Sequence, residues 1–187
     1  MMGWWIWWPP LSEQRMQNLE RKFRCGDLAA AELAARGMGA TDRGVIHQRD
    51  LFFEAPHARL KLRAIAGREA AELISYRRAD SHDARISDYV LAPVMNAEAV
   101  TAVLTHALGR PRELAKVRHL FIYKATRIHI DKVDGAGTFV ELETVLSKGG
   151  PSAEEAEREL AEVVAALGLS EAVPEAYVDL LESGKKV

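Results

Sequence analysis

The sequence is poor in several features that mark particular classes of protein. Its 187 residues include one cysteine, Cys25, which excludes an internal disulfide and fits a reducing, cytoplasmic compartment. No run of about 18 apolar residues occurs, so we expect no transmembrane helix and no membrane partner. The formal net charge at pH 7 is −2. Without an overall basic excess, we do not expect a nucleic-acid partner.

The small net charge hides an uneven distribution along the chain. Residues 17–131 carry 19 lysines and arginines against 14 aspartates and glutamates, whereas residues 132–187 carry 5 against 12. This asymmetry leaves room for a local anion-binding site. Hydrophobic residues make up 48% of the chain, which is enough for the core of one domain.

The N-terminal segment differs from the rest because all four tryptophans lie within its first eight residues. It lacks the basic start of a signal peptide, and Met16 directly precedes the first recognisable strand. We therefore expect residues 1–15 to be a disordered extension and residues 16–187 to form a single domain. A peripheral membrane anchor is the alternative interpretation of the tryptophans.

Helices are predicted where capping residues precede good helix formers. They are 28–37 after Asp27, 97–108 after Asn96, 153–167 after a Ser152–Glu155 capping box, and 174–181 beginning at Pro174. Alternating segments predict strands near 18–22, 47–53, 59–64, 72–78, 89–92, 115–123, 125–133 and 138–146. This order is typical of an antiparallel α+β fold.

Several predicted strands alternate charged and aliphatic residues. Arginine and lysine occupy one face of 59–63 and 116–118, whereas Glu141 and Glu143 share one face of a later strand. One interpretation is a sheet with one solvated face. The other is a closed barrel, whose lumen would gather cations and carboxylates. Such a lumen suits a polyphosphate with divalent cations, because guanidinium groups bind phosphate oxygens and carboxylates hold Mg²⁺ or Mn²⁺.

The segment 18–22, Asn-Leu-Glu-Arg-Lys, resembles the E-x-E-x-K signature of the CYTH superfamily, the triphosphate tunnel metalloenzymes. The resemblance extends in the family's order over about residues 16–182. It includes the segments HQRDLFF at 47–53, RLKLR at 59–63, KVR at 116–118, RIHID at 127–131, GAGTFVELE at 135–143 and YVDLL at 177–181.

The resemblance implies an eight-stranded antiparallel β-barrel with helices packed on its outside. Its metal ligands for Mg²⁺ or Mn²⁺ would be Glu20, Glu141 and Glu143. Asp131 and Lys22 would be catalytic, with Asp131 near the metal or acting in acid–base chemistry. The phosphates would be bound by Lys22, Lys61, Arg63, Arg77, Lys116, Arg118 and Arg127.

Three positions qualify this assignment. Arg78 is an alternative to Arg77, because 72–78 lacks clean alternation. By parity His129 faces the lumen, in either a structural or a catalytic role. Asn18 replaces the first carboxylate of the signature. An amide oxygen ligates a hard cation but adds no charge, so weaker metal binding is expected.

Three functions compete at this stage. The leading one is a class IV-type adenylate cyclase, which converts ATP to cyclic AMP and pyrophosphate. The second is a triphosphatase acting on tripolyphosphate, thiamine triphosphate or nucleotides, and the third is a non-catalytic phosphate-binding module. The partner is ATP or another triphosphate; related cyclases are often dimers, so a homodimer is consistent with the resemblance.

Overall fold

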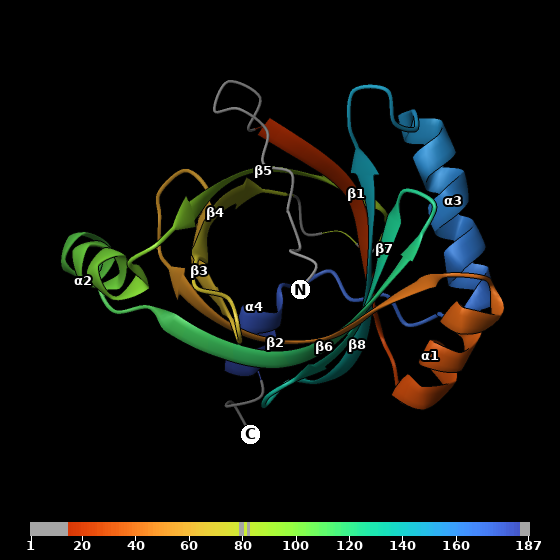
Figure 1. Cartoon of the computed structure of the whole chain (residues 1–187), viewed down its shortest axis with the longest axis horizontal. Coiled ribbons are helices and arrows are strands. Elements are labelled where there is room, and N and C mark those ends of the chain that lie inside the picture. The colour runs from red at the N-terminus through yellow and green to blue at the C-terminus, as the bar shows by residue number, and fades with distance from the viewer. Residues whose placement is uncertain (1–14, 79–80, 82, 184–187) are drawn as a thin grey trace.

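The computed structural model describes residues 15–78, 81 and 83–183. The expected disordered extension, 1–15, lies outside the described residues except for Arg15. The remainder forms one closed barrel with helices around it (Figure 1).

Eight strands form the barrel in the order β1-β5-β4-β3-β2-β6-β7-β8, with β8 pairing back to β1. Every neighbouring pair is antiparallel, which confirms the predicted fold class. Alternate side chains of each strand therefore point into one lumen. The strands are β1 (Arg15–Arg24), β2 (Thr41–Phe53), β3 (Arg59–Ile65), β4 (Ala71–Arg77), β5 (Arg85–Val94), β6 (Arg112–Tyr123), β7 (Thr126–Val133) and β8 (Gly137–Leu146).

Three of the helices begin where the capping residues predict. The side chains of Asp27 and Asn96 accept backbone N–H bonds at the starts of α1 (Leu28–Gly37) and α2 (Ala97–Leu108). The Ser152–Glu155 capping box opens α3 (Ala153–Ala166). None of the helices in the described part of the chain is long and apolar enough to cross a membrane.

The fourth helix, α4 (Tyr177–Ser183), begins three residues later than predicted. The segment before it runs beside β1 in an extended form. Arg24 N–H donates to the Glu171 carbonyl, and Val173 N–H donates to the Lys22 carbonyl. Pro174 therefore follows a backbone engaged in strand-like pairing, and the helix starts only beyond it.

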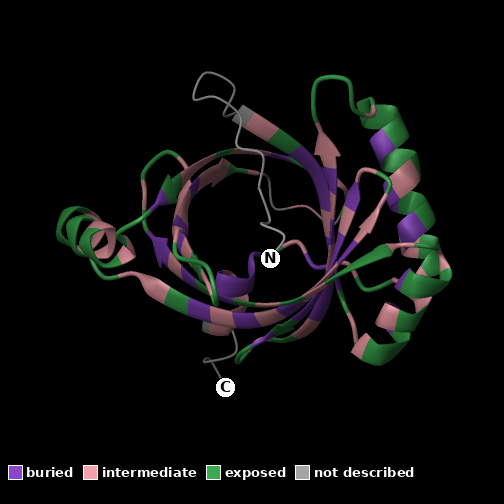
Figure 2. Cartoon of the chain, viewed as in Figure 1, coloured by how far each residue is buried: buried purple, intermediate pink, exposed green. Residues whose placement is uncertain are grey.

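The hydrophobic core lies outside the barrel, between its aliphatic outer face and the helices. Ile128 and Leu142 on β7 and β8 are fully buried and cluster with Ala35 of α1 and with Ala156 and Val163 of α3. Figure 2 shows buried positions on the sides of α1 and α3 that face the barrel. Separate clusters form around α4 and beside α2. Most of the aliphatic side chains are thus buried outside the barrel, and the charged side chains of the strands point into the lumen.

Candidate active site

The lumen contains a cavity of ≈ 530 Å³ with lining residues from all eight strands. Its walls are charged in the middle and apolar at one mouth. The lining residues with ionisable side chains are Glu20, Lys22, Asp50, Lys61, Arg63, Arg68, Glu72, Arg78, Lys116, Arg118, Arg127, His129, Glu141 and Glu143. The predicted lumen-facing cations are therefore brought together, with the exception of Arg77.

One end of the tunnel is closed by α4 and the segment before it. Lys22 Nζ donates to the Glu175 carbonyl at 3.1 Å, and Arg85 Nη1 donates to the Pro174 carbonyl at 2.8 Å. The Tyr177 ring lies 4.0 Å from Lys22 Nζ, and Tyr177 also lines the cavity. Figure 1 shows α4 inside the outline of the barrel. A ligand therefore enters from the opposite end.

The deep cations of β3 and β6 are held in place by buried carboxylates. Asp50 accepts two bonds from Arg63, at 2.8 and 2.9 Å, and lies 3.6 Å from Lys61 Nζ. Burial alone would raise the pKa of Asp50, but Arg63 and Lys61 hold it well below its usual range. Burial and the neighbouring Arg63 together lower the pKa of Lys61 to about 7, against the opposing effect of Asp50.

Asp131 plays the same part for the cations of β6. Its carboxylate accepts from Arg118 Nε at 2.7 Å and Nη2 at 2.6 Å, and from the Tyr177 hydroxyl at 3.0 Å. It is 0% exposed and does not line the cavity. Against the effect of burial, Arg118 and Lys116 keep its pKa far below the usual range. Asp131 thus holds Arg118 and the Tyr177 hydroxyl in place, and its predicted role near the metal or in acid–base chemistry stays a prediction.

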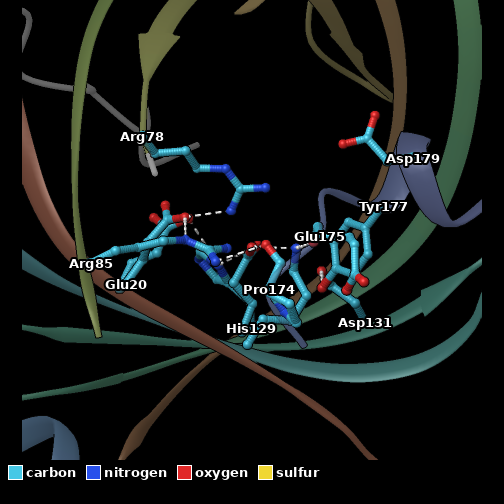
Figure 3. A network of polar contacts seen from close by, with 12 residues as sticks. Glu20, Arg78, Arg85, His129, Asp131, Pro174, Glu175, Tyr177 and Asp179 are labelled. Atoms are coloured by element: carbon cyan, nitrogen blue, oxygen red, sulfur yellow. Dashed lines mark hydrogen bonds and ion pairs between the residues drawn. The ribbon is translucent and has the colours of Figure 1, made fainter. Parts of the chain in front are cut away.

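Glu20 lies between two arginines at the wall of the tunnel. Its Oε1 accepts from Arg78 Nη1 at 2.6 Å and from Arg85 Nε at 3.0 Å. Figure 3 shows both guanidinium groups converging on this carboxylate. The predicted metal ligand is therefore already paired with two cations in the free protein.

Arg77 was predicted to bind phosphate, but it points away from the lumen. It is exposed, and its Nε donates to the His57 carbonyl at 3.1 Å. The inward residues of β4 are Glu72, Ile74 and Tyr76, and the same parity continues to Arg78. The prediction chose the wrong member of the pair, because Arg78 is the one that lines the cavity.

An acidic cluster occupies the wall formed by β7 and β8. The ligand atoms of His129, Glu141 and Glu143 lie within 4.8 Å of one another. Glu141 Oε2 accepts from Arg118 at 3.0 Å, and its Oε1 is 3.4 Å from Lys22 Nζ. The predicted ligands Glu141 and Glu143 are thus neighbours, and Glu20 is not part of this cluster.

Asn18 lies beside the cluster on β1. Its Nδ2 donates to Glu143 Oε2 at 3.3 Å, and Arg127 Nη1 donates to the same oxygen at 3.4 Å. At this position a carboxylate would repel Glu143, whereas the amide forms a hydrogen bond with it. In the absence of a cation, Asn18 therefore forms a hydrogen bond with Glu143 where a carboxylate would repel it.

Sequence reasoning missed Asp50, Arg85 and the inward role of Tyr177. Asp50 had a usable pattern, since Gln48, Asp50 and Phe52 alternate with Arg49 and Leu51 and all three line the lumen. Arg85 was assigned to a loop because the strand was predicted to start at Tyr89. Only the fold shows that Tyr177 reaches Asp131, 46 residues away in the sequence.

The fold and the site together define a β-tunnel whose cavity is lined by lysines and arginines beside a carboxylate cluster. The CYTH domain model matches residues 16–177, and the chain belongs to this family. No curated protein sequence matches the chain.

Solved structures share the fold at low identity. The PH1012 protein of Pyrococcus horikoshii is 21% identical with a TM-score of 0.78, and the match covers 88% of this chain and 99% of that one. A candidate adenylate cyclase of Vibrio parahaemolyticus is 17% identical with a TM-score of 0.67, covering 88% and 97%. HpAC1 of Hippeastrum, a candidate adenylyl cyclase described as having a dominant triphosphatase activity, is 14% identical with a TM-score of 0.64, covering 92% and 97%.

Proposed function

We propose that the protein is a metal-dependent enzyme that processes an organic triphosphate, with conversion of ATP to cyclic AMP and pyrophosphate as the leading reaction. The observation that carries the proposal is the polarity of the tunnel along its axis. One end is closed and cationic, whereas the open mouth is lined by apolar side chains. A molecule with a polyphosphate at one end and an apolar ring at the other matches both regions.

The apolar mouth follows from strand register. On β1 Met16 lies at the opposite end from Lys22, which contacts the segment before α4. On β2 Ile46 lies six residues from Phe52, which packs in the cluster around α4. The half-buried apolar residues of this mouth are Met16, Ile46, Ile65, Leu91 and Leu120. The ion pair of Arg68 and Glu72 lies at the same end, beside the β3–β4 turn. A purely inorganic polyphosphate leaves these side chains without a partner.

The deeper residues are suited to the phosphates. Arg63 and Arg118 present guanidinium groups already oriented by Asp50 and Asp131, so little side-chain entropy is lost when phosphate oxygens bind. Lys61 and Lys116 add point charges from β3 and β6, the two strands that flank β2. These four groups would neutralise the β- and γ-phosphates, which also stabilises pyrophosphate as a leaving group.

Glu141 and Glu143 are the proposed holders of Mg²⁺ or Mn²⁺. The donor set fits such an ion, because both carboxylates line the cavity next to the cations that bind phosphate. When bound, the ion would supply additional charge neutralisation on the phosphate oxygens.

In the proposed cyclisation the protein contributes chiefly orientation. With the pyrophosphate portion held at the closed end, the ribose lies toward the mouth and its 3′-oxygen faces the α-phosphorus. The O3′–P bond forms, the bond from the α-phosphorus to the bridging oxygen breaks, and the hydroxyl proton is released. Positioning of this kind converts flexible ATP into a reactive conformer.

Hydrolysis of the triphosphate is the alternative reaction. The concentration of cations at the closed end favours it, because the terminal phosphate would be the most strongly bound and the most neutralised. HpAC1, which shares this fold, is described as having a dominant triphosphatase activity. The third candidate, a non-catalytic phosphate-binding module, is supported by Asn18, which lowers the negative charge beside Glu143.

Product analysis separates the three candidates. The purified protein is incubated with ATP, tripolyphosphate or thiamine triphosphate, in Mg²⁺ or Mn²⁺, and products are identified by chromatography and ³¹P NMR. Cyclic AMP with pyrophosphate supports the cyclase, and orthophosphate release supports the triphosphatase. Binding without turnover supports the third candidate.

A matched pair of variants ties the result to the tunnel. Lys116→Gln removes a lining cation, whereas Lys132→Gln removes an exposed lysine of β7 outside the lumen. We expect substrate affinity to fall only in the first. Equal behaviour of the two variants would contradict binding in the lumen.

A further inference from the structure

His129 enters the acidic cluster with an unused ligand atom. Its side chain is almost fully buried, at 4% exposure for the residue, and it lines the cavity. Among the described residues none forms a hydrogen bond with its Nδ1. This nitrogen lies 3.6 Å from Glu143 Oε1 and 4.0 Å from Glu141 Oε2.

At these distances neither carboxylate is a hydrogen-bond partner of Nδ1, whichever protonation state the imidazole adopts. A protonated Nδ1 would donate to one of the carboxylates, yet both oxygens lie beyond hydrogen-bond distance. A deprotonated Nδ1 directs its lone pair at two negatively charged groups. A buried polar atom without a partner is costly, so its retention in the lumen calls for a ligand that the protein chain does not supply.

A divalent cation would serve all three groups at once. Glu141 Oε2 would give up its bond from Arg118, but that guanidinium keeps two bonds to Asp131. Bonds of about 2.2 Å place two donors of the same ion at most about 4.4 Å apart. The two separations measured from Nδ1 fall within that limit.

Glu20 is poorly placed for the same role. Its Oε1 is shared by Arg78 and Arg85, and releasing it would leave two buried guanidinium groups without that partner. Glu143 Oε1, in contrast, faces His129, while Arg127 and Asn18 bind Oε2. Glu143 Oε1 is also the nearer of the two carboxylate oxygens to the unpartnered nitrogen of His129, at 3.6 Å against 4.0 Å for Glu141 Oε2.

We infer that His129 Nδ1 is the third protein ligand of the metal centre, with Glu141 and Glu143, and that it makes the centre selective for Mn²⁺ over Mg²⁺. The inference deepens the proposed metal-dependent function and rests on it. Imidazole suits transition ions, whereas Mg²⁺ prefers oxygen donors and octahedral geometry with retained waters. A site with one nitrogen and two carboxylate donors should therefore bind Mn²⁺ more tightly.

The test uses the full-length protein and Mn²⁺ alone, without substrate. Electron spin echo envelope modulation of bound Mn²⁺ should show coupling to ¹⁴N of one imidazole. Titration calorimetry should give a Mn²⁺ affinity at least about tenfold above that for Mg²⁺. His129→Gln, which offers an oxygen donor, should abolish the nitrogen coupling and lower Mn²⁺ affinity at least about tenfold, with a smaller change for Mg²⁺.

His119→Gln is the matched control. His119 precedes the residue paired with His129, but it faces outward and contacts Glu32 and Asp42. This variant should keep the nitrogen coupling and both affinities. Far-UV circular dichroism checks that each variant is folded, and the wild-type spectrum is informative without any variant.

Two outcomes would overturn the inference: wild-type Mn²⁺ without ¹⁴N coupling, or coupling that persists in His129→Gln. Neither depends on turnover, so the result is separate from that of the product analysis. Coupling without turnover would retain the ligand assignment and reject the proposed enzyme. Turnover without ¹⁴N coupling would support the proposed enzyme and reject His129 as a metal ligand.

Discussion

Replacing Asp131 by asparagine should destabilise the fold more than any other single change of charge in the tunnel that we consider. The substitution preserves the shape of the side chain but removes the negative charge between Arg118 and Lys116. It also turns an amide group toward a guanidinium that needs an acceptor. The result is a buried cationic pair that has lost its main partner.

The magnitude follows from the completeness of burial. Asp131 is 0% exposed, the Arg118 side chain 6% and the Lys116 side chain 3%. Solvent therefore offers little compensation, and breaking such a pair costs about 3–5 kcal/mol. Tyr177→Phe removes one hydrogen bond from the same carboxylate and keeps its charge. That variant should lose about 1.5–3 kcal/mol, as for other hydrogen bonds to charged groups.

Urea unfolding followed by circular dichroism measures both values at pH 7. A loss of less than about 1 kcal/mol in Asp131→Asn would refute the reasoning, because a positioning carboxylate cannot be removed so cheaply from a closed network. Tripolyphosphate provides a second readout. Phosphate oxygens would pair with Arg118 and Lys116, so saturating ligand should reduce the difference in stability between variant and wild type.

Three further predictions concern the ligand site. Arg78→Met should weaken tripolyphosphate binding at least about tenfold, because it removes a charge-assisted contact. Arg77→Met is the control and should leave binding unchanged. If calorimetry finds equal effects, the assigned orientations of the two side chains are wrong. Binding at pH 8 should take up protons, because burial lowers the pKa of Lys61 to about 7 and the phosphates raise it again. Tripolyphosphate affinity should therefore fall as the pH rises from 6 to 9. Binding enthalpies that are identical in buffers of different ionisation enthalpy would exclude this proton uptake. The charged and titratable groups near Lys61 are Asp50, Arg63, Tyr76, Lys116 and Glu141. Asn18→Glu should raise Mn²⁺ affinity. It should also destabilise the metal-free protein by about 1–3 kcal/mol, because it replaces a hydrogen bond to Glu143 with charge repulsion. Unchanged metal affinity would refute this account of Asn18.

Strand alternation made much of the tunnel predictable from the sequence. Lys61, Arg63, Lys116 and Arg118 all face the lumen as the period of two requires. The capping residues predicted the starts of α1, α2 and α3 for an equally local reason. Such features depend on neighbouring residues, which a single sequence displays directly.

The remaining features depend on contacts between distant segments. Nothing local distinguishes Arg77 from Arg78 at the end of β4, and the choice is made by Glu20 on β1. The start of α4 likewise depends on backbone pairing between 171–173 and β1. Asp131 looked catalytic in its motif, but its burial behind Arg118 required knowledge of β6 and α4 together.

The distribution of charge and apolar surface explains why this barrel tolerates a charged interior. Burial disfavours the protonated forms of Lys61 and Lys116, which lowers their pKa values despite nearby carboxylates. The burial of charged groups in the lumen therefore costs stability, and the apolar clusters outside the barrel, against α1 and α3 and against α2, supply the compensating stability. A polyanion that enters the tunnel raises the pKa of both lysines and so favours their protonated forms. Ligand binding and folding stability should thus rise together, by about 2.7 kcal/mol at a ligand concentration of 100 times Kd.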